Sequence, residues 1–212
     1  MKTLIINGSP NGERGNTEML SREFTKGMQA GPEVRYVARE DAAALAEYMQ
    51  SFDKWLFFFP LYVNAMPGIV KRLFEQLQPN PEKSVGYFIQ SGFEEAAQSD
   101  YLVTILNNFS KRMGYQDLGI IVAGGMAGVR YMPPQMNRKT FEHMQRAGKL
   151  YEQTGKFADE SIKHFGHLYR YTEKKAKRNQ LMRKLGIANI WWNSMLKKNK
   201  AYQKRYDKPF GV

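Results

Sequence analysis

The chain has 212 residues, which is enough for a full hydrophobic core and suits one domain with an appendage. It contains no cysteine, which excludes disulfides, thiolate metal sites and cysteine-ligated iron–sulfur clusters. The formal net charge is +12, but fourteen lysines and arginines against four acidic residues lie from Ala158 onward. The chain before that residue is therefore close to neutral, and a strongly basic body is excluded.

The first predicted elements are a short apolar strand at residues 3–6 and a helix that Thr17 is expected to cap. The apolar positions of this helix follow helical spacing as far as Met28, and Gly31-Pro32 is expected to end it. Between the two elements lies a stretch rich in glycine, asparagine and serine, residues 7–17. A turn that joins a strand to a helix in this way places free backbone N–H groups at the positive end of the helix dipole.

This turn is expected to bind a phosphate group. Its glycines Gly8, Gly12 and Gly15 are expected to permit positive φ, while short side chains such as Ser9 can donate to phosphate oxygens. The turn lacks the lysine of a P-loop, and its glycines are spaced G-x-x-x-G-x-x-G instead of G-x-G-x-x-G. Neutral donors suit a single terminal phosphomonoester, such as that of flavin mononucleotide (FMN). The alternative is that the stretch is only a turn.

Next come a short strand at 34–37, expected at or near a sheet edge, and a helix from Asp41 to Met49. Residues 54–59 are almost continuously apolar, which is typical of a central parallel strand covered on both faces. The strand stops at Pro60. A second loop, 60–68, follows at the carboxyl end of this strand and leads into a helix predicted over 69–77. Ligands of open parallel sheets bind at this edge.

At these two loops the sequence resembles the flavodoxin-like NAD(P)H-dependent FMN reductases and quinone reductases. The phosphate loop of that family reads Gly-Ser-Pro or Gly-Ser-x, a few residues, then Asn-Thr or Asn-Ser, as residues 8–17 do. The family's second loop reads Pro-x-Tyr-x-x-x-x-Pro-Gly before a lysine-containing helix. The matching positions here are Pro60, Tyr62, Pro67, Gly68 and Lys71. A plain connector with Tyr62 in the core is the alternative.

The resemblance implies bound FMN, with its phosphate in the first loop and its ring against residues 61–64. A strand at 84–90 ends in a third loop at the same edge, residues 91–95, whose small residues let backbone N–H groups approach the flavin. No side chain is expected to act as a catalytic acid or base, and no metal ligand is assigned. The cofactor-binding residues expected are Ser9, Asn11, Gly15, Asn16, Thr17, Pro60, Leu61, Tyr62, Val63, Asn64, Ser91, Gly92 and Phe93.

The remaining core elements are a helix at 99–113 closed by Gly114, a strand at 117–123 and a helix at 140–153. The segment 129–137, with Arg130, Tyr131 and two prolines, is expected to be a lid over the ligand edge or a packed connector. The element order predicts an α/β flavodoxin-like doubly wound sheet of five parallel strands in the order 2-1-3-4-5. This FMN-binding domain is expected to span residues 1–157.

Residues 158–212 are predicted to form a basic, aromatic-rich helical extension. Its apolar residues favour docking on the body or on another subunit, and the alternative is an anionic membrane surface. His164 and His167 share a helical face but have no evident third ligand, so they are interpreted as packing or surface histidines. Nucleic-acid binding is the least favoured use of the charge, because no base-reading module is present.

The function predicted is an FMN-dependent oxidoreductase that takes electrons from NAD(P)H and passes them to a small acceptor, such as a quinone or a free flavin. The resemblance implies a homodimer, and the absence of a signal-peptide pattern implies the cytoplasm. Two other functions stay open. One is a flavodoxin-like one-electron carrier, and the other is a scaffold whose basic tail binds a membrane surface or nucleic acid.

Overall fold

The computed structural model of the chain describes residues 1–166, 170, 172–186 and 189–208. Contacts between residues divide the chain into two units, Met1–Arg170 and Tyr171–Val212, which are described separately below. The first unit contains the whole sheet. It continues past Ala158, where the sequence analysis places the start of the extension.

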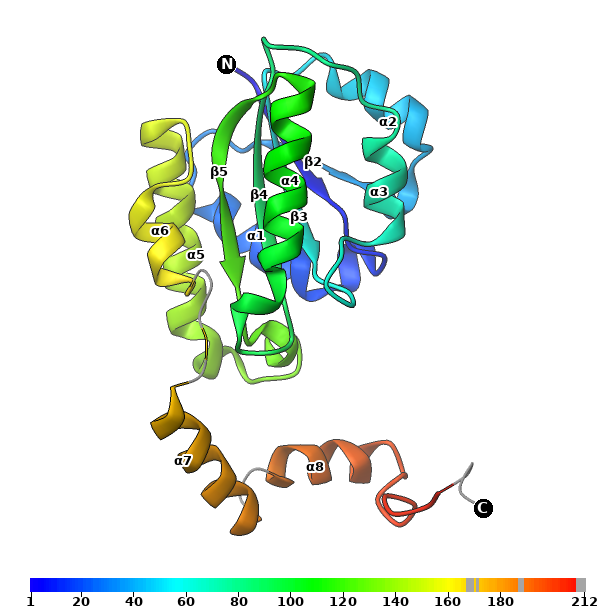
Figure 1. Cartoon of the computed structure of the whole chain (residues 1–212), viewed down its shortest axis with the longest axis vertical. Helices are drawn as coiled ribbons and strands as arrows, with labels where there is room; N and C mark the ends of the chain where they lie inside the picture. The colour runs from blue at the N-terminus through cyan, green and yellow to red at the C-terminus, as the bar shows by residue number, and fades with distance from the viewer. Residues whose placement is uncertain (167–169, 171, 187–188, 209–212) are drawn as a thin grey trace. The chain divides into compact units, whose positions relative to one another are not determined.

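The first unit is built on five parallel strands in the order β2-β1-β3-β4-β5, which confirms the predicted flavodoxin-like topology (Figure 1). The strand bounds are β1 Thr3–Asn7, β2 Glu33–Tyr36, β3 Lys54–Pro60, β4 Ser84–Gln90 and β5 Gln116–Ala123. The short strand β2 lies at one edge, as expected, and β3 lies in the centre between β1 and β4.

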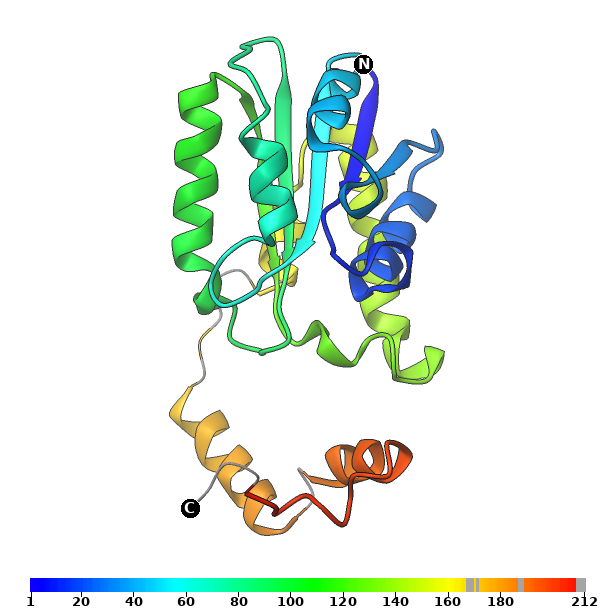
Figure 2. The same ribbon diagram turned by 90° about the vertical axis from the view of Figure 1, so that its right-hand side faces the viewer.

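Helices cover both faces of this sheet (Figures 1 and 2). Side chains of α2 (Ala42–Met49), α3 (Gly68–Phe74) and α4 (Asp100–Met113) share one core cluster with one face of the strands. Side chains of α1 (Asn16–Lys26), α5 (Pro134–Thr154) and residues next to α6 (Asp159–His164) share a second cluster with the other face. Short 3₁₀ turns are η1 Gly12–Arg14, η2 Val37–Arg39, η3 Ala96–Ser99 and η4 Met126–Gly128.

The central strand β3 explains the long apolar run in the sequence. Its residues from Trp55 to Pro60 are all buried, because helices cover both faces of the strand. Phe57 points into the first cluster and Phe58 into the second, as the two-residue period of a strand requires. The ring of Phe58 stacks on Phe88 of β4, with 5.0 Å between their centroids.

The boundaries of three helices differ from the sequence prediction. Helix α1 begins at Asn16 with the extended residue Gly15 as its N-cap, so Thr17 lies inside the first turn, and Gly27 rather than Gly31 ends the helix. Helix α3 ends at Phe74 instead of residue 77. Helix α5 begins at Pro134 instead of residue 140, because proline already has the φ of a first helical position and needs no N–H partner there.

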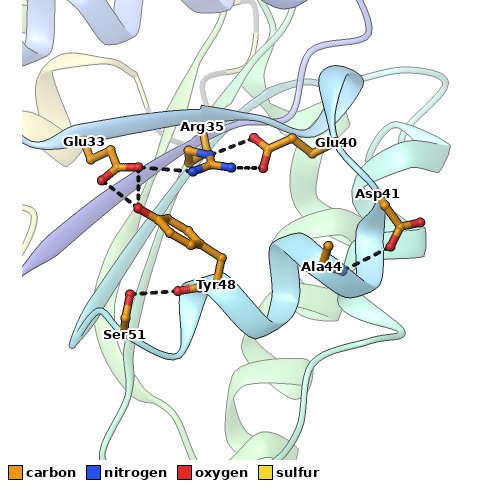
Figure 3. A network of polar contacts seen from close by, with 7 residues as sticks. All are labelled: Glu33, Arg35, Glu40, Asp41, Ala44, Tyr48 and Ser51. Atoms are coloured by element: carbon orange, nitrogen blue, oxygen red, sulfur yellow. Dashed lines mark hydrogen bonds and ion pairs between the residues drawn. The ribbon is translucent and has the colours of Figure 1, made fainter.

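The edge strand β2 is protected by a network of charged side chains (Figure 3). Arg35 donates to both carboxylate oxygens of Glu40 and also to Glu33, while the Tyr48 hydroxyl donates to Glu33. The Arg35 guanidinium also lies 4.2 Å from the centroid of the Tyr48 ring. Asp41 caps α2 by accepting from the N–H groups of Ala43 and Ala44.

Helices α1 and α5 cross at two glycines. A Cβ atom on Gly148 would lie 1.9 Å from the carbonyl oxygen of Phe24, and one on Gly27 would lie 1.8 Å from that of Gln145. No side chain fits at either position, so the two backbones are in direct contact. The crossing holds the helix that follows the first loop against the helix that follows β5.

Helix α6 belongs to the first unit. Phe165, directly after it, is buried and packs edge-on against Phe88 of β4, with 5.6 Å between the ring centroids. His164 stacks on His143 of α5, whereas His167 lies outside the described residues. The second unit contains α7 (Glu173–Lys184) and α8 (Ile190–Lys198), so the C-terminal region is helical, as predicted.

Candidate functional site

Four loops meet at the carboxyl edge of the sheet, which is the lower edge in Figure 1, toward which the arrowhead of β5 points. They follow β1, β3, β4 and β5 and enclose a cavity of about 260 Å³. The residues that line it are Ser9, Asn11, Asn16, Pro60, Leu61, Tyr62, Gln90, Ser91, Gly92, Met126 and Ala127. Larger hollows exist elsewhere on the first unit, but this one lies where parallel sheets bind ligands.

The loop after β1 is held in a tight curl. The Ser9 Oγ accepts from the N–H of Asn11 at 3.2 Å, and the N–H of Gly12 donates to the carbonyl of Ser9 at 2.9 Å. Positive φ, expected at three glycines, occurs only at Gly12. Gly15 is needed for space instead, because a Cβ there would lie 3.0 Å from the Ser9 Oγ. Gly8 packs against α3, where a Cβ would lie 2.4 Å from Val70.

The buried side chains of Asn7 and Glu18 support this loop through hydrogen bonds. The side-chain oxygen of Asn7 accepts from the N–H of Ser9 at 3.0 Å, and its nitrogen donates to Glu18 at 3.2 Å. Arg22 and the Tyr36 hydroxyl both donate a hydrogen bond to the Glu18 carboxylate. Burial, and to a smaller extent the hydrogen bond to Glu18, raises the pKa of Tyr36 to about 12. These hydrogen bonds fix the backbone of the loop at Ser9, whose N–H donates to Asn7.

Asn16 and Thr17 lie in the first turn of α1, and their side chains already form hydrogen bonds with other protein atoms. The Asn16 amide donates to the carbonyl of Met126 at 2.9 Å and accepts from the N–H of Arg130 at 3.1 Å. The Thr17 hydroxyl, which is buried, accepts from the Gln90 amide at 2.8 Å. Asn16 therefore ties the first loop to the loop after β5, and Thr17 ties it to β4.

The loop after β3 contains a two-residue turn. Tyr62 and Ala65 exchange both backbone hydrogen bonds, at 2.9 and 3.0 Å, while Val63 and Asn64 both have positive φ, of 48° and 61°. Such a turn favours asparagine and glycine, so the β-branched Val63, 97% exposed, is strained there. The turn leaves Tyr62 at the mouth of the cavity, 45% exposed.

The loops after β4 and β5 are joined by backbone hydrogen bonds. The N–H of Gly125 donates to the carbonyl of Phe93, and the N–H of Met126 donates to that of Ser91, both at 2.8 Å. Gly124 permits this approach, because a Cβ there would lie 2.3 Å from the carbonyl oxygen of Glu94. These two loops therefore form one connected wall of the cavity. The segment 129–137, predicted as a lid or a packed connector, is helical from Pro134 onward.

Gln90, the last residue of β4, lines the cavity although it is almost fully buried. The nitrogen of its side-chain amide bonds Thr17, while its oxygen has no hydrogen-bond partner among the described residues. A buried polar atom without a partner costs free energy, so an acceptor at this position suits a donor on a ligand.

The structure brings most of the predicted cofactor-binding residues to this cavity. The lining residues among them are Ser9, Asn11, Asn16, Pro60, Leu61, Tyr62, Ser91 and Gly92. The other predicted residues lie in the same loops but do not line the cavity, and they are Gly15, Thr17, Val63, Asn64 and Phe93. Their assignment to a cofactor stays a prediction.

Sequence reasoning missed Gln90, Met126 and Ala127, which also line the cavity, and the supporting pair Asn7 and Glu18. Asn7 and Gln90 share a signal, because each is a polar residue that ends an otherwise apolar strand. No comparable signal marks Met126, whose position depends on the pairing of two loops.

Every residue that lines the cavity in the described part of the chain is uncharged. Positive potential is supplied by the start of α1, where the N-cap Gly15 offers no side chain to the first N–H groups of the helix. The arrangement therefore offers an anion site beside a cavity with an uncharged lining. It suits a ligand with one phosphate and a polar ring system.

The comparisons with known proteins agree with the fold. A family model described as flavodoxin-like fold matches residues 1–81. A search of curated proteins by sequence finds no match.

Among solved structures, an NAD(P)H:quinone oxidoreductase from Methanothermobacter marburgensis matches 72% of this chain and 98% of its own, at 14% identity and a TM-score of 0.57. An NADPH-quinone reductase from P. pentosaceus matches 69% and 96%, at 18% identity and a TM-score of 0.53. An FMN-dependent NADH-azoreductase from Bacillus anthracis, in complex with FMN, matches 72% and 100%, at 12% identity and a TM-score of 0.51. At these identities the likeness concerns the fold.

Proposed function

We propose that the protein is an FMN-dependent oxidoreductase that takes electrons from NAD(P)H and passes them to a small acceptor such as a quinone or a free flavin. The observation that carries the proposal is the cavity at the carboxyl edge. It joins the loops after β1, β3 and β4, each of which contains residues predicted for FMN from the sequence.

The first loop fits the phosphate of FMN. The start of α1 offers backbone N–H groups, and the Ser9 hydroxyl, which accepts from Asn11, keeps its own hydrogen for a phosphate oxygen. Asn7 accepts from the N–H of Ser9 and so fixes the backbone of the loop, and Gly15 leaves space beside the Ser9 hydroxyl. The absence of lysine from the loop fits one phosphate better than a triphosphate.

The other loops fit the ring system. Leu61 and Tyr62 supply an apolar and an aromatic surface on one side of the cavity, and Gly92 lets the backbone approach from another. The side-chain oxygen of Gln90, for which the described part of the chain supplies no hydrogen-bond partner, would accept from an N–H group of the ring. A cavity of about 260 Å³ is small for the whole cofactor, so part of the ring would face solvent and the second substrate.

Bound FMN would supply the transfer of electrons itself. The residues of this chain would bind the phosphate, orient the ring and leave one of its faces open to both substrates in turn. No side chain of the cavity needs to act as an acid or base, which agrees with the uncharged lining. The names of the structural neighbours, which include quinone reductases and an FMN-dependent azoreductase, support the same chemistry. A homodimer, expected from the family resemblance, stays a prediction.

Steady-state oxidation of NADH and NADPH by the FMN-loaded protein, with a quinone as acceptor, tests this function. We expect turnover that depends on both FMN and acceptor. Double-reciprocal plots of the initial rate should give parallel lines, as in a ping-pong mechanism, because the two substrates react with the flavin in turn. Tight FMN binding without NAD(P)H oxidation would favour the one-electron carrier instead. Tyr62→Ala should change turnover or FMN affinity without unfolding the protein, while Tyr101→Ala, an exposed tyrosine that does not line the cavity, is the control.

A further inference from the structure

The second unit, Tyr171–Val212, concentrates the charge of the chain. It holds twelve lysines and arginines against two acidic residues, a net charge of +10 of the total +12. Ten of the twelve basic residues form two groups, one in α7 between Lys174 and Arg178 and one from Lys197 to Lys208, and Arg183 and Lys184 lie between these groups. Such a density of one sign of charge is far above what solubility requires.

Apolar side chains lie between the two basic groups and face solvent. No described residue of α7 is buried, and Leu181 and Leu185, which share a helical face, are 56% and 63% exposed. Ile190 and Trp192, at the start of α8, are also exposed. Their apolar character predicts that the body of the protein or another subunit covers them. Phe165 is buried as expected, whereas Leu168, Tyr169 and Tyr171 lie outside the described residues.

Aromatic rings and cations also combine at the end of the unit. The Arg205 guanidinium lies 3.9 Å from the centroid of the Tyr202 ring and 4.6 Å from that of Tyr206, which is 80% exposed. Tyrosine and tryptophan favour the boundary between lipid and water, because one end of each ring is apolar and the other polar.

We propose that residues 171–212 bind the surface of an anionic lipid membrane. Lysine and arginine would attract anionic headgroups, and the exposed aliphatic and aromatic side chains between the two basic groups would enter the boundary of the acyl chains. The charge complementarity selects anionic lipid, and the aliphatic residues favour lipid over nucleic acid, whose backbone offers them no apolar partner. None of the described helices is long and apolar enough to cross a membrane, so the binding is peripheral.

Co-sedimentation of the full-length protein with vesicles tests this inference independently of flavin binding. We expect binding to phosphatidylcholine vesicles that contain about 30% phosphatidylserine, little binding to pure phosphatidylcholine, and weakening by added salt. The triple variant Lys197→Glu, Lys198→Glu, Lys200→Glu should bind at least about tenfold more weakly. The apolar variant Leu181→Gln, Leu185→Gln, Ile190→Gln should also lose affinity, which pure charge attraction would not explain.

The control has the same change in net charge in the first unit. It is Lys139→Glu, Lys149→Glu, Lys156→Glu, three exposed lysines, and it should bind as tightly as the unaltered protein. Equal weakening by both triple variants would mean that only total charge matters and would overturn the inference. Binding to a short RNA or DNA duplex but not to the vesicles would also overturn it. Binding to neither ligand would leave docking on protein as the use of this unit and would refute the membrane assignment.

Discussion

Ser9 and Thr17 lie in one turn and carry similar hydroxyls, yet the surroundings of the two hydroxyls differ. Both residues are buried and both hydroxyls accept a hydrogen bond, but Ser9 lines the cavity and can donate to a ligand there, whereas Thr17 does not line it. Ser9→Ala should therefore weaken FMN more than riboflavin, by about 1.5 to 3 kcal/mol, because a donor to a charged phosphate is lost. The affinities for both flavins, measured by fluorescence titration, check this.

Thr17→Val is the matched variant for that prediction. It leaves the Gln90 nitrogen without its acceptor in a buried place, so it should lower the free energy of unfolding by about 1 to 3 kcal/mol. Thr17 is predicted from the sequence as a cofactor-binding residue, but it does not line the cavity, so this variant should leave the preference for FMN over riboflavin unchanged. The opposite pattern, with selectivity lost in Thr17→Val and kept in Ser9→Ala, would show that the phosphate lies elsewhere in the turn.

Val63 is strained because a β-branched residue has positive φ there. Its side chain is 97% exposed, so replacing it removes no packing. Val63→Asn should raise the free energy of unfolding by about 1 kcal/mol, since asparagine tolerates this backbone conformation. Urea denaturation measures the change. Val63→Thr keeps the branch at Cβ and should give no gain, and a similar gain from both variants would refute strain as the cause.

At the scale of elements, the crossing of α1 and α5 makes an unusual prediction for a helical glycine. Alanine normally stabilises a helix relative to glycine by up to about 1 kcal/mol. In Gly148→Ala, however, the new Cβ would meet the carbonyl oxygen of Phe24, so we expect a loss of about 1 to 3 kcal/mol. Thermal unfolding decides the sign. Gly68→Ala is the control, because nothing lies within 4 Å of a Cβ there, and it should be neutral or stabilising.

The free energy of unfolding should depend on pH through His164, which lies at the contact between α5 and α6. Burial, and then the nearby His143, lowers the pKa of His164 below its ordinary value of 6.5, while Glu160 acts in the opposite direction. Glu160 itself is paired with Arg146 of α5. The folded state therefore binds the proton of His164 less readily than the unfolded state. The contribution of His164 to the free energy of unfolding is therefore fully present above about pH 6.5 and is lost as the pH falls below that value.

Thermal unfolding at about pH 7.5 and 5.5 measures this dependence, in a range where the histidines titrate and most carboxylates do not. His164→Gln should reduce the difference between the two midpoints. An unchanged difference would place the pH-dependent group elsewhere in the molecule.

At the scale of the whole molecule, the topology could be predicted because the sheet is regular. The continuous apolar run at 54–59 indicated a strand covered on both faces, and the turns at 7–17 and 60–68 indicated the ligand edge. The eight lining residues that were predicted from local sequence all lie in the segments 7–17, 60–68 and 91–95.

Features that depend on contacts between distant segments could not be predicted in the same way. The use of Asn16 to hold the loop after β5, and the contact of Gly148 with Phe24, exist only once α1, α5 and β5 are in place. The early start of α5 at Pro134 was missed because prolines indicate a loop as well as a first helical turn.

The central claim is that the cavity at the carboxyl edge of the sheet binds FMN. Its most direct test is titration of FMN with the purified full-length protein, followed by the fluorescence of the flavin. We predict saturable quenching that is stoichiometric with the chain, with clearly tighter binding of FMN than of riboflavin. Flavin fluorescence that stays unchanged at saturating protein would contradict the claim, and equal affinity for both flavins would contradict the assignment of the first loop to the phosphate.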